Sequence, residues 1–280
     1  MKNKNDTSSI SFTAHYTGYV WQRYGLSEPV FATAQGHTYY SLLRPFEFLA
    51  RRLIGSDIKT TLLQRHFLID RELEKRIAEN PQTQVLEIAC GLSPRGHRFT
   101  RKHPQLVYVE ADLPGMVARK RSVLAPLNSL DAQHRLTVCN ILESGNDSLE
   151  NVMAREFDTS KPLIVITEGL VNYFDLPTIS GVWQRLATAL KAFPQGLYLT
   201  DVYPEVQEHR FAGLIRAANQ SLRVASRSRF SLHFKNADHM RQHFSGLGFH
   251  HVDVFNPDKE DTGAPKASGG AIVRVIAAAS

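Results

Sequence analysis

Four acidic residues stand inside or just after short apolar runs, where a folded sheet presents ligand-binding groups. Glu87 interrupts the run VLEIAC, and Glu168 directly follows LIVIT. Glu110 and Asp112 lie 23 and 25 residues after Glu87, at the end of VYVEAD. A buried carboxylate is costly without a partner, so each acid implies a ligand or a cation. Carboxylates at the end of the second run also match the paired hydroxyl donors of a ribose.

The run that contains Glu87 stops at Gly91 and opens into a polar segment with Ser93 and Pro94. A buried strand that ends in such a turn before a helix is how open α/β sheets build a cofactor crevice. A dinucleotide fingerprint would need glycines at Ala89, Gly91 and Pro94. Pro94 lacks an N–H group, which disfavours a nicotinamide oxidoreductase. A phosphate-binding loop would need Lys after Gly96, and the chain has His there. An ordinary glycine turn, and a helix cap at Asp112, are the plain alternatives.

Short apolar runs alternate with helical stretches from Thr83 onward, and the first 80 residues have helical spacing. We expect strands at Thr83–Ala89, Leu106–Glu110, Leu136–Cys139, Leu163–Thr167, Leu197–Val202, His251–Phe255 and Ala271–Ile276. We expect helices at Tyr39–Ile54, Thr60–Ala78, Arg95–Lys102, Pro114–Leu124, Ser148–Glu156, Leu176–Ala192 and about 205–225. This alternation predicts an α/β fold with a Rossmann-like, seven-stranded, mostly parallel sheet, an antiparallel edge strand and a helical N-terminal cap.

The length of 280 residues suits one large α/β domain with a helical cap, which we place at 1–80 and 81–280, with a helical insertion about 205–236. The net charge of +6 is modest, so we expect no nucleic-acid partner. Two cysteines form no disulfide framework, and the start MKNKNDTSSISF has no apolar signal core. No run is long enough to span a bilayer. We therefore expect a cytoplasmic protein that has no membrane partner.

Three segments in order resemble the leucine carboxyl methyltransferase-like family, which includes bacterial polyketide-type O-methyltransferases. They are VLEIACGLSPRGHRF, VYVEADLPGMVARKR and LIVITEGLVNYF, within a similarity that runs from about Tyr39 to Asp201. Members are class I methyltransferases that use S-adenosyl-L-methionine (SAM). The resemblance therefore implies SAM as cofactor and a small-molecule or protein methyl acceptor. It leaves the acceptor's identity and the oligomeric state open.

The resemblance also implies roles for individual residues. Ala89 and Gly91 would lie against the methionine part of SAM, with Glu87 supporting the loop or the ligand ammonium. Asp112 matches the ribose-binding acid, and Glu110 is its neighbour. The remaining cofactor contacts implied by the family pattern are Arg65 for the SAM carboxylate, Asn140 and Ile141 beside the adenine, and Glu168 after the fourth strand.

The chain departs from the family pattern at Ala89, where relatives carry Gly, and at Ser93-Pro94, where they carry Asp-Thr. These departures keep a non-catalytic SAM-fold binding module open as an alternative. We expect O-methylation of a carboxyl or hydroxyl group, with N-methylation of a lysine or small amine as the other enzymatic reading. The catalytic group is unknown, and the candidates for facing the substrate are Tyr16, Tyr19 and Tyr173. His239 and His243 lack a third ligand in the sequence, so we expect no metal site.

Overall fold

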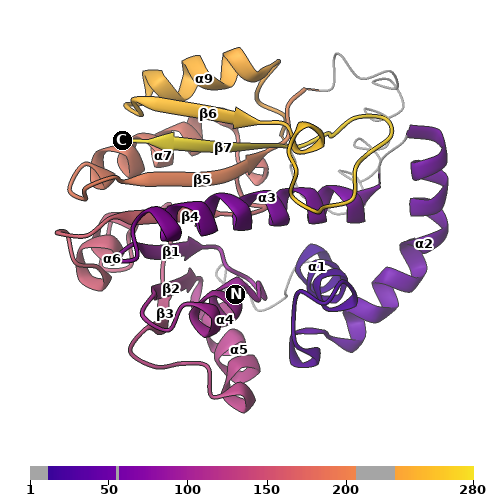
Figure 1. Ribbon diagram of the computed structural model, residues 1–280, viewed down its shortest axis with the longest axis horizontal. Coiled ribbons are helices and arrows are strands. Elements are labelled where there is room, and N and C mark those ends of the chain that lie inside the picture. The colour runs from indigo at the N-terminus through magenta and orange to yellow at the C-terminus, as the bar shows by residue number, and fades with distance from the viewer. Residues whose placement is uncertain (1–11, 55–56, 206–230) are drawn as a thin grey trace, which may run out of the picture. The chain divides into compact units, whose positions relative to one another are not determined.

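The computed structural model describes residues 12–54, 57–205 and 231–280 of the chain. They fall into two compact units, one built from residues 12–44 and 76–166, and the other from residues 45–54, 57–75, 167–205 and 231–280. Figure 1 shows the elements of both. The helix expected at about 205–225, and most of the expected insertion, lie outside the described residues. The domain boundary near residue 80 stays a prediction.

In the described part of the chain, seven strands form one sheet in the order β3-β2-β1-β4-β5-β7-β6. The strands are β1 (Gln84–Ile88), β2 (Val107–Asp112), β3 (His134–Val138), β4 (Leu163–Thr167), β5 (Leu197–Val202), β6 (His251–Phe255) and β7 (Arg274–Ala279). The helices are α1 (Phe12–Arg23), α2 (Ala34–Ile54), α3 (Ile58–Glu79), α4 (Arg95–Lys102), α5 (Pro114–Leu124), α6 (Leu149–Glu156), α7 (Leu176–Leu190) and α9 (Ala237–Gly246). Short 3₁₀ turns are η1 (Pro29–Phe31), η2 (Ala125–Leu127), η3 (Val171–Tyr173) and η4 (Pro257–Lys259).

The predicted fold class is confirmed by this mostly parallel, seven-stranded sheet. β1 pairs with β2, and β2 with β3, in parallel register. The antiparallel pairing involves β7, which lies between β5 and β6 and is antiparallel to both. All five residues of β1 are buried, as are all five of β4. Burial along the whole strand is typical of strands that helices cover on both faces.

In the first unit, α4 and α5 pack against β2 and β3. α5 begins at Pro114, and Leu113 is its N-cap residue without a side-chain cap. The alternative that Asp112 caps this helix is therefore wrong, because its carboxylate lies one residue too early. Asp112 is left at the carboxyl end of β2, where open sheets bind ligands.

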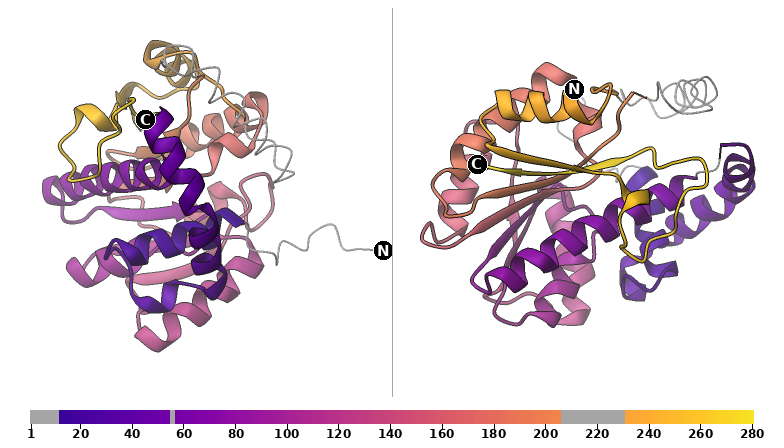
Figure 2. Two further views of the ribbon diagram at one scale, coloured as in Figure 1. Left: turned by 90° about the vertical axis from the view of Figure 1, so that its right-hand side faces the viewer. Right: turned by 45° about the horizontal axis from the view of Figure 1, so that its top comes forward.

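In the second unit, an aromatic core joins α7, α9 and β5 on one face of the strands. The ring of Trp183 lies 4.6 Å from that of Phe244, and Tyr198 stacks on Phe249 at 6.1 Å. Figure 2 shows α9 on this face and α3 on the opposite face of β5, β7 and β6. The α3 residue Arg71 lies over the ring of Phe255 in β6, at 5.9 Å. These contacts bury the strands from both sides and leave their ends free to carry polar groups.

None of the helices in the described part of the chain is long and apolar enough to cross a membrane.

Candidate cofactor site

The loop after β1 is held to the end of β2 by one carboxylate. Ala89 and Gly91 both have left-handed backbones, with φ of 53° and 49°. The N–H group of Gly91 donates to Oδ2 of Asp112 at 2.8 Å, and that of Leu113 donates to Oδ1 at 2.8 Å. Each carboxylate oxygen keeps a second lone pair, because an ionised carboxylate offers about four acceptor sites. Asp112 therefore fixes the loop and can still accept from a ligand.

Burial raises the pKa of Asp112 above its ordinary value, against the lowering effect of its two backbone hydrogen bonds. The residue is half-buried, in contrast to the other acids of the same two strands. Among the acids predicted for this unit, Asp112 is the one that accepts from backbone N–H groups and is also partly exposed to solvent. This is the place in the sheet where the sequence predicts a ribose contact.

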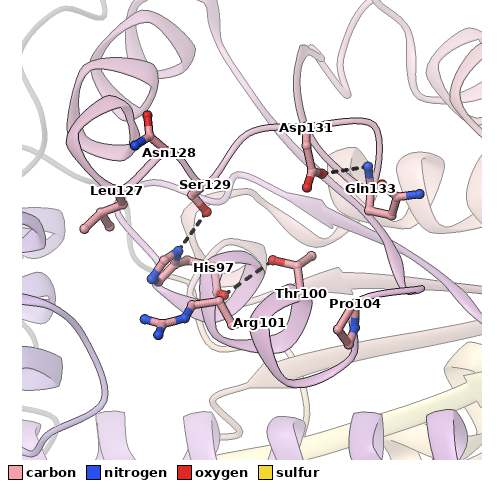
Figure 3. A pocket seen from close by; sticks show the side chains of 9 residues that line it. All are labelled: His97, Thr100, Arg101, Pro104, Leu127, Asn128, Ser129, Asp131 and Gln133. Carbon is pink, nitrogen blue, oxygen red and sulfur yellow. Dashed lines mark hydrogen bonds between the residues drawn. The ribbon is translucent and has the colours of Figure 1, made fainter.

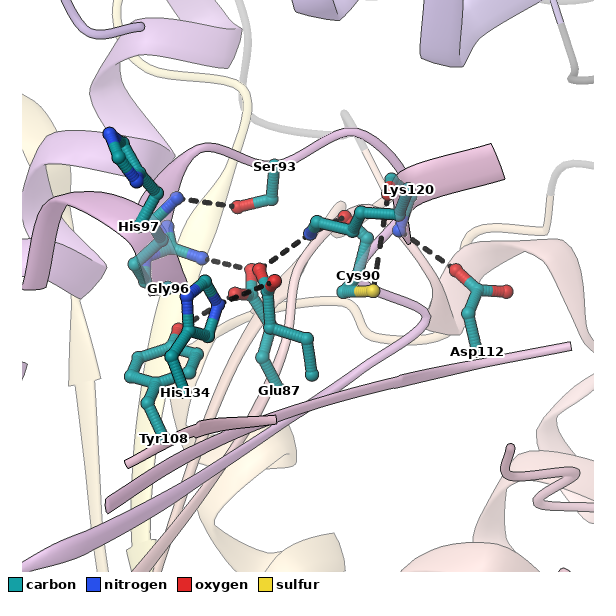
Figure 4. Close-up of polar contacts among 12 residues, drawn as sticks. Glu87, Cys90, Ser93, Gly96, His97, Tyr108, Asp112, Lys120 and His134 are labelled. Atoms are coloured by element: carbon teal, nitrogen blue, oxygen red, sulfur yellow. Dashed lines mark hydrogen bonds and ion pairs between the residues drawn. The ribbon is translucent and has the colours of Figure 1, made fainter. Parts of the chain in front are cut away.

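Glu87 is only 1% exposed, and its carboxylate lies within the protein (Figure 4). Oε1 accepts from Nη1 of Arg95 at 2.7 Å, and Oε2 accepts from the hydroxyl of Tyr108 at 2.7 Å. Arg95 is itself completely buried at the start of α4. The charge inside the first apolar run is thus satisfied by a cation from the helix that follows the loop. Glu87 supports the position of α4, and neither of these contacts leads to a ligand.

Glu110 is completely buried. Its Oε1 accepts from Nζ of Lys120 at 2.5 Å, and its Oε2 lies 2.9 Å from Nε2 of His134. Burial would raise the pKa of Glu110, but Lys120 and His134 outweigh it and hold that pKa below its ordinary value. Lys120 also lies 3.5 Å from the carbonyl oxygen of Cys90 in the loop. Glu87 and Glu110 thus both have internal partners that hold α4 and the loop. Their contact with a cofactor stays a prediction.

Gly96 allows α4 to approach this buried charge cluster. A Cβ atom at this position would lie 2.6 Å from Cδ of Glu110 and 2.7 Å from Nε2 of His134. Cβ atoms in real proteins essentially never lie so close to a non-bonded heavy atom, so a side chain here must displace the ion pair. Close packing of α4 against β2 thus depends on the absence of a Cβ atom at Gly96.

Asn140 and Ile141 follow β3 in a tight turn. Oδ1 of Asn140 accepts from the N–H of Leu142 at 3.1 Å, and its Nδ2 donates to Glu143 at 2.8 Å. Ile141 is 7% exposed. The turn therefore presents a mainly apolar residue next to a polar side chain that is already used to shape the backbone.

In the second unit, α3 directs Arg65 toward the ends of β4 and β5. Its Nε donates to Oε1 of Glu168 at 3.0 Å, and its Nη1 donates to Oδ2 of Asp201 and to the hydroxyl of Tyr203, both at 3.1 Å. The other carboxylate oxygen of Glu168 lies 2.9 Å from Nδ1 of His66. The structure thus brings together the two residues predicted here, Arg65 and Glu168, and adds three partners to them.

Asp201 also binds the turn after β4. Its Oδ1 accepts from the N–H of Gly169 at 2.6 Å, while its Oδ2 contacts Arg65. Burial raises the pKa of Asp201, and Arg65 acts in the opposite direction. Burial likewise raises the pKa of Tyr203 to about 12, so the phenol stays protonated at neutral pH. This cluster couples two carboxylates, one guanidinium and one phenol at the carboxyl ends of two strands.

The tyrosines predicted to face a substrate lie in different surroundings. Tyr16 is 1% exposed and stacks on Tyr40, with ring centroids 6.1 Å apart. Tyr19 is half-buried, and its ring lies 5.1 Å from that of Tyr40 and 5.2 Å from that of His37. Tyr173 is 37% exposed on η3. Tyr16 thus packs in the core of the first unit, and Tyr173 is the most accessible of the three.

His239 and His243, four residues apart on α9, are used in packing. Nε2 of His243 lies 2.8 Å from Oγ of Ser180, and its ring packs 6.0 Å from that of Trp183. The described residues contain no group of three or more His, Cys, Asp or Glu side chains placed to hold a metal ion.

A separate pocket of about 430 Å³ lies in the first unit between α4 and the segment before β3 (Figure 3). Its lining includes His97, Arg101, Ser129 and Asp131, and it contains none of the predicted cofactor residues. Nδ1 of His97 lies 2.7 Å from Oγ of Ser129, which lies 2.9 Å from Nδ1 of His134. The pocket wall is therefore connected by hydrogen bonds to the cluster around Glu110.

A family model described as leucine carboxyl methyltransferase matches residues 30–187, more than half of the chain. The chain belongs to this family. As a member it is a SAM-dependent methyltransferase, with SAM as the methyl donor. A search of curated proteins found no match.

Solved structures share the fold at low sequence identity. A protein assigned as a methyltransferase from Thermobifida fusca YX is 13% identical, with a TM-score of 0.64, over 98% of this chain and 96% of that one. A duf574 family protein from Streptomyces avermitilis is 14% identical, with a TM-score of 0.64, over 97% of this chain and 98% of that one. A protein assigned as an O-methyltransferase from Nostoc punctiforme is 14% identical, with a TM-score of 0.52, over 79% of this chain. This chain spans 60% of that protein's length.

Sequence reasoning missed Asp201, Tyr203 and His66. The signal for the first two was present, because Asp201 and Tyr203 end the run LYLTDVY, as Glu168 ends LIVIT. The rule that ligands lie beyond the carboxyl ends of strands applies to β5 as it does to β4. No comparable signal in the sequence marks His66, the residue after Arg65 on α3.

Proposed function

We propose that this member of the family transfers the methyl group of SAM to an oxygen atom of a carboxyl or hydroxyl group. The observation that carries the SAM site is the Asp112 carboxylate, held by the N–H of Gly91 at 2.8 Å with acceptor capacity left over. It stands at the end of the strand next to β1, where a ribose is bound in sheets of this kind. The match to the carboxyl methyltransferase family supports the oxygen acceptor.

In the first unit we assign the ribose hydroxyls to Asp112 and the methionine part of SAM to the loop of Ala89 and Gly91. Asn140 and Ile141 remain our assignment for the adenine side. The left-handed backbone at Ala89 and Gly91 turns the loop sharply, so that backbone groups approach a ligand closely. This role needs no side chain, which is consistent with a loop of small residues.

In the second unit we assign the carboxylate of SAM to Arg65 and its ammonium group to Glu168. The two side chains are already paired at 3.0 Å. A zwitterionic amino-acid group presents one charge of each sign, and a paired cation and anion complement both. Glu168 is held from its other side by His66, so neither charge has to be reorganised on binding.

Methyl transfer from a sulfonium is an in-line displacement with a neutral leaving group. The protein therefore has to hold the nucleophile near the methyl carbon and exclude water. A carboxylate acceptor is ionised at pH 7 and needs no general base, whereas an amine first has to lose a proton. This favours a carboxylate acceptor in a site built around cofactor contacts.

Calorimetry with SAM and with S-adenosylhomocysteine tests the first part of the proposal. We expect Asp112→Ala to weaken SAM binding by about a hundredfold, because two hydrogen bonds to a charged group are lost. The matched control is Asp158→Ala, which also removes a carboxylate that accepts from a backbone N–H, at 2.9 Å, but in an exposed loop. Binding that is equal in both variants, or absent from the wild type, would remove the basis of the assignment.

Labelled methyl transfer from SAM into a lysate identifies the acceptor class. A carboxyl methyl ester releases labelled methanol on mild alkaline treatment, whereas an ether or an N-methyl group keeps the label. Release of the label supports the carboxyl acceptor, and retention on an amine contradicts oxygen transfer. The control is the Asp112→Ala variant, which should transfer little label to any fraction.

A further inference from the structure

The guanidinium of Arg65 has five N–H donors, and three of them are used within the second unit. Nε donates to Glu168, and the two N–H groups of Nη1 meet acceptors on Asp201 and Tyr203. Nη2 makes no hydrogen bond with any described residue, and both of its N–H donors remain free. Arg65 is 7% exposed, so these two donors are the part of a buried cation that is left for a ligand.

A planar guanidinium cannot turn one nitrogen without turning the others. Holding Nε and Nη1 therefore fixes the direction of Nη2. Glu168 supplies one of these restraints, and the other comes from Asp201 and Tyr203 at the end of β5. Without Asp201 and Tyr203, only the hydrogen bond from Nε to Glu168 would orient the guanidinium.

Asp201 also fixes the backbone turn at Gly169. Its Oδ1 accepts from the N–H of Gly169 at 2.6 Å, and Gly169 has a left-handed φ of 70°. A Cβ atom on Gly169 would lie 2.7 Å from Nη2 of Arg65. The backbone turn that Asp201 holds is thus the surface against which the free nitrogen lies, so one carboxylate positions the guanidinium and its backbone support together.

We propose that Asp201, assisted by Tyr203, is a positioning residue that directs Nη2 of Arg65 at the carboxylate of SAM and so sets the preference for carboxylated over decarboxylated cofactor. This inference rests on the proposed function, in which Arg65 binds that carboxylate. Neither Asp201 nor Tyr203 touches the ligand in this arrangement. Their effect is confined to one functional group of SAM, which makes it separable from a general loss of stability.

The experiment measures dissociation constants for SAM and for decarboxylated SAM, which lacks only the carboxylate, by calorimetry on the full chain. The wild type should prefer SAM, and Arg65→Ala should abolish that preference. Asp201→Asn should reduce the preference about tenfold, since neighbours in one hydrogen-bonded network couple by that order. Asn can still accept from Gly169 N–H, but its amide N–H₂ cannot pair with a guanidinium. Affinity for decarboxylated SAM should change little.

Tyr203→Phe removes one hydroxyl at nearly constant volume, and should reduce the preference about threefold. It decides the proposal alone if Asp201→Asn does not fold. The control is Thr200→Val, one residue earlier on β5, where the side chain points to the other face and bonds Thr167 at 2.8 Å. That variant loses this bond and a longer one to the backbone carbonyl oxygen of Asp201, at 3.3 Å. It leaves the Asp201 carboxylate in place and should keep the wild-type preference.

Three outcomes separate the possible failures. If the wild type binds neither cofactor, the proposed function fails, and this inference fails with it. If the wild type binds both equally, or Arg65→Ala keeps the preference, the Arg65 assignment fails. If Arg65→Ala loses the preference while folded Asp201→Asn and Tyr203→Phe keep it, only the positioning role is overturned.

Discussion

Replacing Gly96 by alanine tests whether the buried charge cluster of the first unit sets how closely α4 can pack. An alanine in a helix is ordinarily more stable than a glycine, by about 0.5–1 kcal/mol. At Gly96 the added Cβ atom would lie 2.6 Å from Cδ of Glu110, 2.8 Å from its Oε1 and 2.7 Å from Nε2 of His134. All three atoms belong to completely buried side chains that have little room to move.

The cost follows from what has to shift. Overpacking a core by one methyl group costs about 1–3 kcal/mol, and separating a buried ion pair costs about 3–5 kcal/mol. Because Glu110 is held at 2.5 Å by Lys120, partial displacement is the expected response. We therefore expect Gly96→Ala to lower the free energy of unfolding by about 2–4 kcal/mol, a sign opposite to helix propensity.

Urea unfolding followed by circular dichroism measures this difference. The control is Gly181→Ala in α7, where the new Cβ atom meets nothing within 4 Å, and where we expect a gain of about 0.5–1 kcal/mol. A Gly96→Ala protein as stable as the wild type, or more so, would refute the close approach described for α4. A loss of stability in both variants would point instead to a general intolerance of Gly→Ala changes in these helices.

Three further changes test the loops. Ala89→Gly should raise the free energy of unfolding, measured in urea, by about 0.5–1 kcal/mol. Removing the strain of a left-handed alanine outweighs the added freedom of glycine in the unfolded chain. A loss of stability would contradict the left-handed conformation at this position. SAM affinity, measured by calorimetry, should fall as the pH drops through the raised pKa of Asp112, because the protonated acid loses acceptor capacity. The affinity of Asp112→Asn should not change with pH over the same range. An equal pH dependence in both proteins would rule out Asp112 as the group that titrates. Gly169→Ala should weaken SAM binding at least tenfold, measured against decarboxylated SAM, because its Cβ atom would displace Nη2 of Arg65, 2.7 Å away.

The strand and helix pattern could be predicted from the sequence because each apolar run is short and ends in a turn. The bounds of α4 are an example, because the expected helix Arg95–Lys102 is the observed one. The sequence also indicated which strand ends carry acids. Because the carboxyl ends of parallel strands lie on one edge of a sheet, these acids could be expected at the same edge.

The partners of those acids could not be predicted, since they come from residues that look like surface charges. Lys120 lies within the run ARKR, yet it is completely buried beside Glu110. Arg95 opens a basic, polar helix, yet it is completely buried beside Glu87. Whether a charge faces water or another charge depends on the angle of the helix against the sheet, and spacing along the chain does not encode it. For this reason the buried ion pairs of Glu87 and Glu110 could not be read from the sequence.

The buried cluster of Glu110, Lys120 and His134 also constrains how this protein can change over evolutionary time. Losing any one member leaves a charge or a polar ring without its partner in the interior, at a cost of about 3–5 kcal/mol. A domain whose whole stability is about 5–15 kcal/mol tolerates few such intermediates. Replacing all three by apolar residues of similar volume, in contrast, is often neutral. The three positions should therefore be inherited as a unit, and descendants should keep the cluster whole or lose it in closely linked steps.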